Sequence, residues 1–99
     1  MSHDVAYNQL SPAEAERLAI LSEELGEAIQ AIGKILRHGY AESHPAKTHD
    51  NRTDLERELG DVRFAALQMC EAGDINKDRV RDYTEDKRIR VAKYLHHQS

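Results

Sequence analysis

Leucine and isoleucine recur at steps of three and four residues through the first third of the chain, which is the spacing of one face of an α-helix. This apolar stripe consists of Leu18, Leu21, Leu25, Ile29, Ile32 and Leu36. Ser11 can cap such a helix, Pro12 suits its first position, and Glu14 completes a capping box. Gly39 then ends the run. The pattern predicts a helix over residues 12–38.

Two further helices are predicted by the same kind of signal. The second has Thr53 as its cap, with a capping box, and ends at Gly73. The third takes Asp74 or Asn76 as its cap and runs to about residue 97. Since no segment alternates like a strand, the predicted fold class is all-α.

Residues 38–53 separate the first two helices and form a long loop, which is polar and carries three histidines and a proline. Loops of this length are usually functional or disordered. Residues 1–10 are compatible with a short helix or with a tail. We expect a single domain over residues 1–99, a helical bundle of three to four helices per chain that is completed by homo-oligomerisation.

The composition supports a small domain that gains burial by self-association. The chain has 99 residues, of which 39% are hydrophobic, with one Phe and no Trp, so large core side chains are few. The single Cys70 fits a reducing compartment, and neither a signal pattern nor a membrane-spanning run is present. We therefore expect a cytoplasmic protein with no membrane partner. The net charge of −4 argues against a nucleic-acid partner.

Acidic residues in the first predicted helix lie next to its apolar stripe. In the segment EELGE, residues 23–27, a rotation of about 100° per residue places Glu24 at the edge of the stripe and Glu27 about 60° further on. Ile20 and Ala31 lie between these two directions, one turn to either side. Glu23 lies further toward the outside. A solvated acidic face would not normally include an Ile and an Ala.

The second predicted helix has a similar acidic pair at a similar position. Its inner stripe consists of Leu55, Val62, Ala66 and Met69. Glu58 lies within that stripe, and Asp61 lies about 60° to one side, beside Ala65. An ionised carboxylate on a core-facing position is costly unless a cation neutralises it. Packing the two helices together would gather four carboxylates in one volume, which favours a hard divalent cation such as Mg2+.

These carboxylates have two other interpretations. Each pair taken alone is compatible with solvated glutamates that pair with Lys or Arg on a helix surface. The combination of two inward pairs with like spacing favours the metal site instead. A di-iron bundle requires Glu-x-x-His on two helices, and no Glu in this chain is followed by His at that spacing.

The paired motifs resemble those of the MazG-like, all-α nucleoside triphosphate pyrophosphohydrolases. The motifs are Glu23-Glu24-Leu25-Gly26-Glu27 and Glu58-Leu59-Gly60-Asp61, and the resemblance extends from about Leu18 to Tyr94. It implies Mg2+-dependent cleavage (with Mn2+ as a substitute) between the α and β phosphates. It also implies that Glu24, Glu27, Glu58 and Asp61 are metal ligands. Glu23 would be an auxiliary ligand or would orient the attacking water.

The resemblance further implies that a basic residue on a late helix binds the substrate phosphates, and that the bundle is assembled from two subunits or from a pair of dimers. Lys87 is the preferred residue, because Val80, Tyr83, Val91 and Tyr94 lie on the same side of the third helix. Arg88 and Arg90 are weaker candidates. A lysine that simply extends to the surface remains an open alternative for Lys87.

The sequence thus favours a nucleoside triphosphate pyrophosphohydrolase. Two alternatives stay open: the phosphoribosyl-ATP pyrophosphohydrolase of histidine synthesis, which belongs to the same superfamily, and a non-enzymatic helical dimer that acts as a binding or regulatory module. The preferred base and sugar do not follow from the motifs.

Overall fold

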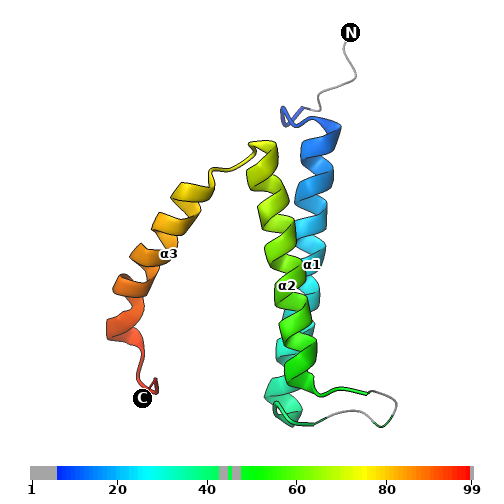
Figure 1. The fold of residues 1–99 in the computed structure, drawn as a ribbon, viewed down its shortest axis with the longest axis vertical. Coiled ribbons are helices and arrows are strands. Elements are labelled where there is room, and N and C mark those ends of the chain that lie inside the picture. The colour runs from blue at the N-terminus through cyan, green and yellow to red at the C-terminus, as the bar shows by residue number, and fades with distance from the viewer. Residues whose placement is uncertain (1–6, 43–44, 46–47, 99) are drawn as a thin grey trace.

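The described part of the chain consists mainly of three α-helices. The computed structural model describes residues 7–42, 45 and 48–98. Helix α1 spans Pro12–His38, α2 spans Asn51–Ala72 and α3 spans Lys77–Val91, followed by a single 3-10 turn, η1, at Ala92–Tyr94 (Figure 1). The described residues contain no strand, so the predicted all-α class is confirmed.

Helix α1 begins and ends where the sequence predicts. The Ser11 side chain accepts a hydrogen bond from the Glu14 backbone N–H at 3.1 Å, and the Glu14 carboxylate accepts one from the Ser11 N–H at 2.8 Å. This reciprocal pair is a complete capping box. At the other end Gly39 has φ 87°, a conformation that glycine adopts without strain.

Helix α2 begins earlier than predicted, so the assignment of Thr53 as its cap is wrong. Asp50 is the cap, and its carboxylate accepts hydrogen bonds from the N–H of Thr53 at 2.9 Å and from its hydroxyl at 2.8 Å. These bonds lower the pKa of Asp50. Asp and Thr are both good caps, and Asp50 is favoured because Thr53 serves as its hydrogen-bond donor. The end at Gly73, with φ 85°, is as predicted.

Helix α3 begins as predicted and ends earlier. The Asn76 side chain accepts bonds from the N–H groups of Asp78 and Arg79 at 2.9 and 3.0 Å, which selects it over Asp74 as the cap. The α-helix stops at Val91 and not near residue 97. Every residue of α3 except Val91 is exposed, so no packing within the chain holds a longer helix in place.

The loop between α1 and α2 is fastened at both ends. The Asn51 N–H donates to the Glu42 carbonyl, and the Arg52 N–H donates to the Tyr40 carbonyl, both at 3.0 Å. The buried Asn51 side chain donates to the Gly39 carbonyl at 3.1 Å. The loop comprises residues 39–50 and is thus shorter than the predicted loop of residues 38–53. For residues 1–10 a short helix or a tail was expected; residues 1–6 lie outside the described residues, and residues 7–10 are not helical.

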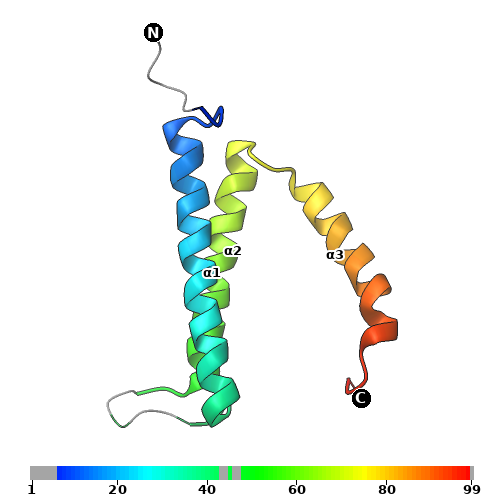
Figure 2. The ribbon, with the colours of Figure 1, turned by 180° about the vertical axis from the view of Figure 1, so that it is seen from behind.

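Helices α1 and α2 lie side by side and run antiparallel (Figures 1 and 2). Among the described residues, the buried apolar ones are Ala28, Ala31, Ala65 and Met69. Three of the four are alanines, which let the two backbones approach closely. This hairpin is the scaffold on which the acidic residues are placed.

The predicted leucine stripe of α1 is not the face that packs against α2. Leu25 is 45% exposed, Ile29 67% and Leu36 82%. Ala28 and Ala31 occupy a neighbouring face, about a quarter turn away. Ala19, Ser22, Gly26 and Gly33 form a further face of small residues on α1. No described residue packs on it at Gly26, where a side chain would meet no atom within 4 Å. Both faces remain open in the single chain.

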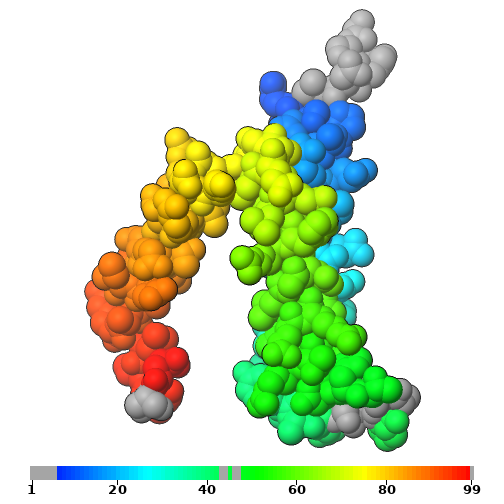
Figure 3. Space-filling view, viewed as in Figure 1, coloured from blue at the N-terminus to red at the C-terminus, as the bar shows by residue number. Residues whose placement is uncertain are grey.

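Helix α3 stands away from the hairpin beyond the turn that joins it to α2 (Figures 1 and 3). A bidentate ion pair fastens that turn, because Arg17 of α1 donates to Asp74 from Nε at 2.6 Å and from Nη2 at 3.0 Å. The radius of gyration is 17.7 Å, whereas a compact domain of this length has about 13 Å. The chain alone is thus an open, extended shape.

None of the helices in the described part of the chain combines the length and the apolar character that a membrane span requires.

Candidate metal centre

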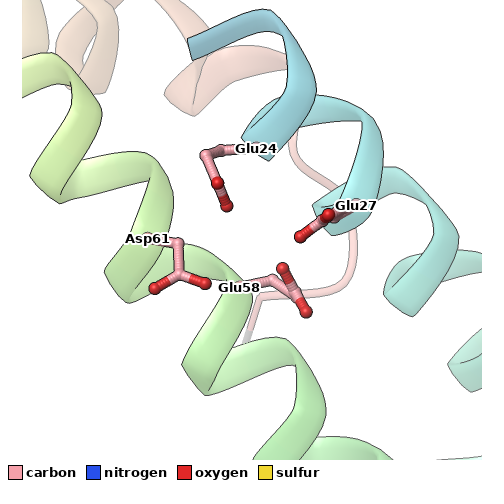
Figure 4. Close-up of side chains that lie close together, drawn as sticks. All are labelled: Glu24, Glu27, Glu58 and Asp61. Carbon is pink, nitrogen blue, oxygen red and sulfur yellow. The ribbon is translucent and has the colours of Figure 1, made fainter. Parts of the chain in front are cut away.

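Four carboxylates converge between the two helices of the hairpin. Glu24 and Glu27 reach from α1, and Glu58 and Asp61 reach from α2 (Figure 4). One oxygen from each of the four lies within 4.8 Å of the others. The spacing of three residues in each pair places both members on one face of its helix. The predicted gathering of these four side chains is therefore present in the structure.

The close packing of the hairpin explains why these side chains are drawn inward. Glu24 is one turn from Ala28, and Glu58 is seven residues from Ala65, so both glutamates follow the buried stripe of their helix. Both are half-buried, whereas Glu27 and Asp61 are exposed. The group therefore extends from the helix interface to the solvent, which leaves one side accessible to a ligand.

The site carries more negative charge than its surroundings neutralise. Burial raises the pKa of Glu24, and the negative charges of Glu27, Asp61 and Glu23 add to the effect. Burial is also the main reason that the pKa of Glu58 is raised; a hydrogen bond with Glu27 and the charges of its acidic neighbours raise it further. Among the described residues, no Lys, Arg or His forms an ion pair with any of the four carboxylates. Solvated helix-surface glutamates would not show this pattern.

Two oxygens of the group lack a partner. Oε2 of Glu24 and Oε2 of Glu58 are both buried and accept no hydrogen bond from any residue that the structure describes. A buried polar atom without a partner costs free energy, and a cation between the helices would satisfy both oxygens at once. A set of four carboxylates, all oxygen donors, suits a hard divalent ion such as Mg2+ or Mn2+. The residues present therefore fit a metal ion.

The other predicted site residues do not join this group within one chain. Glu23 is exposed and is not among the converging ligands. Lys87, Arg88 and Arg90 are on α3, away from the hairpin (Figure 2). Arg88 pairs with Glu85 at 3.1 Å and Arg90 with Asp86 at 2.8 Å, both on α3 itself. The roles of these residues stay predictions.

A hollow that the sequence did not predict adjoins the carboxylates. Its volume is about 370 Å3, and it is lined by Glu27, Gln30, Ala31, Lys34, Asp54 and Glu58. Lys34 could have been found from the sequence, because it follows Glu27 by seven residues and so lies on the same side of α1. Asp54 in the same hollow is within 2.6 Å of Nε2 of His49.

Comparison with known proteins agrees with the paired acidic motifs. Residues 13–96 match the MazG nucleotide pyrophosphohydrolase domain, a span that contains all four converging carboxylates. No curated protein and no solved structure matches the chain.

Proposed function

The chain belongs to the MazG nucleotide pyrophosphohydrolase family, and on that premise we propose that it hydrolyses a nucleoside triphosphate to the monophosphate and pyrophosphate with Mg2+. The observation that carries the proposal is the convergence of four carboxylates, two of which have a buried oxygen without a partner. A helical module that only binds a partner has no need for such a concentration of charge.

In this proposal the four carboxylates hold the metal and Glu23 assists them. Glu24, Glu27, Glu58 and Asp61 supply the ligand oxygens, and Mn2+ can replace Mg2+. When bound, the metal neutralises phosphate charge and polarises the phosphoanhydride. Glu23, on the exposed side of α1, orients the attacking water or serves as an auxiliary ligand. The reaction consumes one water, breaks the bridge between the α and β phosphates and releases a proton.

We further propose that the working form is a homodimer or a dimer of dimers. The accessible surface of the chain is 8259 Å2, whereas a folded monomer of this mass has about 5,700 Å2. The difference of about 2,500 Å2 is enough for an obligate interface. In such an assembly Lys87, with Arg88 and Arg90 as lesser candidates, approaches the phosphates from an α3 that packs against a hairpin. The single free Cys70 supports a cytoplasmic location.

A panel of nucleotides tests the reaction and separates the alternatives. Canonical and deoxy nucleoside triphosphates, together with phosphoribosyl-ATP, would each be incubated with Mg2+ and with EDTA, and pyrophosphate and orthophosphate would be measured separately. We expect pyrophosphate as the first phosphate product from at least one nucleoside triphosphate, and none in EDTA. Exclusive cleavage of phosphoribosyl-ATP would assign the protein to histidine synthesis. Orthophosphate as the first product, or no turnover of any compound, would contradict the proposal.

A further inference from the structure

Two hollows flank the four carboxylates along the hairpin. Ile20, Glu27 and Lys34 follow one another at seven-residue intervals, so they lie on one side of α1 with Glu27 in the middle. Lys34 lines the hollow of about 370 Å3 on the side of the α1–α2 loop. Ile20 lines a second hollow of about 390 Å3 on the side of the α2–α3 turn. A substrate anchored at the carboxylates can therefore extend in two directions.

The two hollows differ in the cation that each offers. Arg17 lines the hollow near Ile20, but its guanidinium is held by both carboxylate oxygens of Asp74. Lys34 forms no ion pair or hydrogen bond with any described residue. The positive charge available to a ligand is thus on the Lys34 side.

The lining of the hollow near Lys34 suits phosphate groups better than a nucleobase. Of the described residues that line it, Ala31 alone is apolar and none has an aromatic ring, so these residues offer a base nothing to stack on. Gln30 offers amide N–H donors beside the Lys34 ammonium. The Asp54 carboxylate, which would repel a phosphate, is already engaged by His49 at 2.6 Å.

We propose that Lys34, assisted by Gln30, binds the two phosphate groups that leave as pyrophosphate. The polyphosphate then runs from the carboxylates toward the α1–α2 loop, and the nucleoside lies toward Ile20. This inference rests on the proposed function for the identity of the ligand. It makes Lys34 a substrate-binding residue that acts separately from the four metal ligands and from Lys87.

Calorimetry on the full chain with Mg2+ tests the assignment. Inorganic pyrophosphate and a panel of nucleoside monophosphates would be titrated separately into the parent, Lys34→Gln, Lys34→Arg and Lys93→Gln. Lys93, on η1 over the Tyr94 ring, is the matched control for loss of one lysine charge. We expect Lys34→Gln to weaken pyrophosphate binding at least tenfold, Lys34→Arg to retain most of it, and Lys93→Gln to change nothing. Monophosphate binding should change less than threefold in all of them.

Three results would overturn the inference. The first is that the parent does not bind pyrophosphate, and the second is that Lys34→Gln binds pyrophosphate as the parent does. The third result is that Lys34→Gln loses binding of the monophosphates alone, which would mean that the substrate runs in the opposite direction. These results are distinct from failure of the proposed reaction. A parent that hydrolyses nucleoside triphosphates while Lys34→Gln binds pyrophosphate normally contradicts only the role of Lys34. A parent that binds pyrophosphate through Lys34 but hydrolyses nothing contradicts only the reaction.

Discussion

The melting temperature of this protein should rise with protein concentration, because the single chain buries too little to fold alone. In the part of the chain that the structure describes, the buried apolar residues are three alanines and one methionine. Large side chains such as Ile29, Leu36 and Ile89 are 67%, 82% and 76% exposed. If a second copy covers them, folding and association are one process, and mass action links stability to concentration.

The size of the effect follows from the chain length. At about 0.7 kcal/mol of unfolding enthalpy per residue, a dimer of this 99-residue chain unfolds with about 140 kcal/mol near 60 °C. For a dimer that unfolds directly to two chains, each tenfold rise in concentration then raises Tm by about 4 °C; for a tetramer the increase is about 5 to 6 °C. Differential scanning calorimetry over two decades of concentration resolves the two cases.

A charged substitution on the exposed leucine stripe should weaken the assembly. About two thirds of the Ile29 side chain remains to be buried by a partner, which is worth about 1 to 2 kcal/mol per chain. Since a symmetric dimer contains the substitution twice, Ile29→Asp should raise the dissociation constant about 30- to 900-fold. Tyr7→Asp, at a position that is 98% exposed outside the helices, is the control. Light scattering that gives a monomer for the parent, with a Tm independent of concentration, would refute the reasoning.

Three further predictions concern the charged residues. Mg2+ at a hundred times its dissociation constant should stabilise the parent by about 2.7 kcal/mol. Glu58→Gln should lose both this stabilisation and the release of pyrophosphate, yet its Tm in EDTA should be no lower than that of the parent. If Mg2+ stabilises Glu58→Gln as much as the parent, the metal site is contradicted. Because Glu24 and Glu58 have pKa values above the ordinary 4.5, the folded state holds their protons more tightly than the unfolded chain. In EDTA the Tm should therefore fall as pH rises from 4.5 through those raised pKa values, less steeply in Glu58→Gln; equal profiles would show that Glu58 does not contribute. Lys87→Ala should reduce turnover about tenfold or more. Full activity in this variant, together with an inactive Arg90→Ala, would show that Arg90 and not Lys87 binds the phosphates.

The sequence by itself determined the helices and the convergence of the carboxylates. Capping residues such as Ser11, and glycines at positions 39 and 73, act through local hydrogen bonds and backbone angles, so most helix ends could be predicted. The spacing of three residues in each acidic pair, with Glu58 on an inner stripe, was enough to place the four carboxylates together. The helix ends depend on neighbours within a few residues along the chain, whereas the meeting of the two acidic pairs also requires that α1 and α2 pack together.

Only the tertiary structure decided which face of α1 meets α2 and where α3 lies. Periodicity gives the direction of each side chain around a helix, but α1 carries two adjacent stripes, one with Leu25 and Ile29 and one with Ala28 and Ala31. Within the chain the alanine stripe packs against α2, because small side chains allow the closest backbone approach, and the stripe with Leu25 and Ile29 stays exposed. The spacing from Glu27 places Lys34 on the same side of α1, but the hollow that it lines also involves Asp54 and Glu58 of α2, so the sequence of α1 indicated the side and only the tertiary structure showed the hollow.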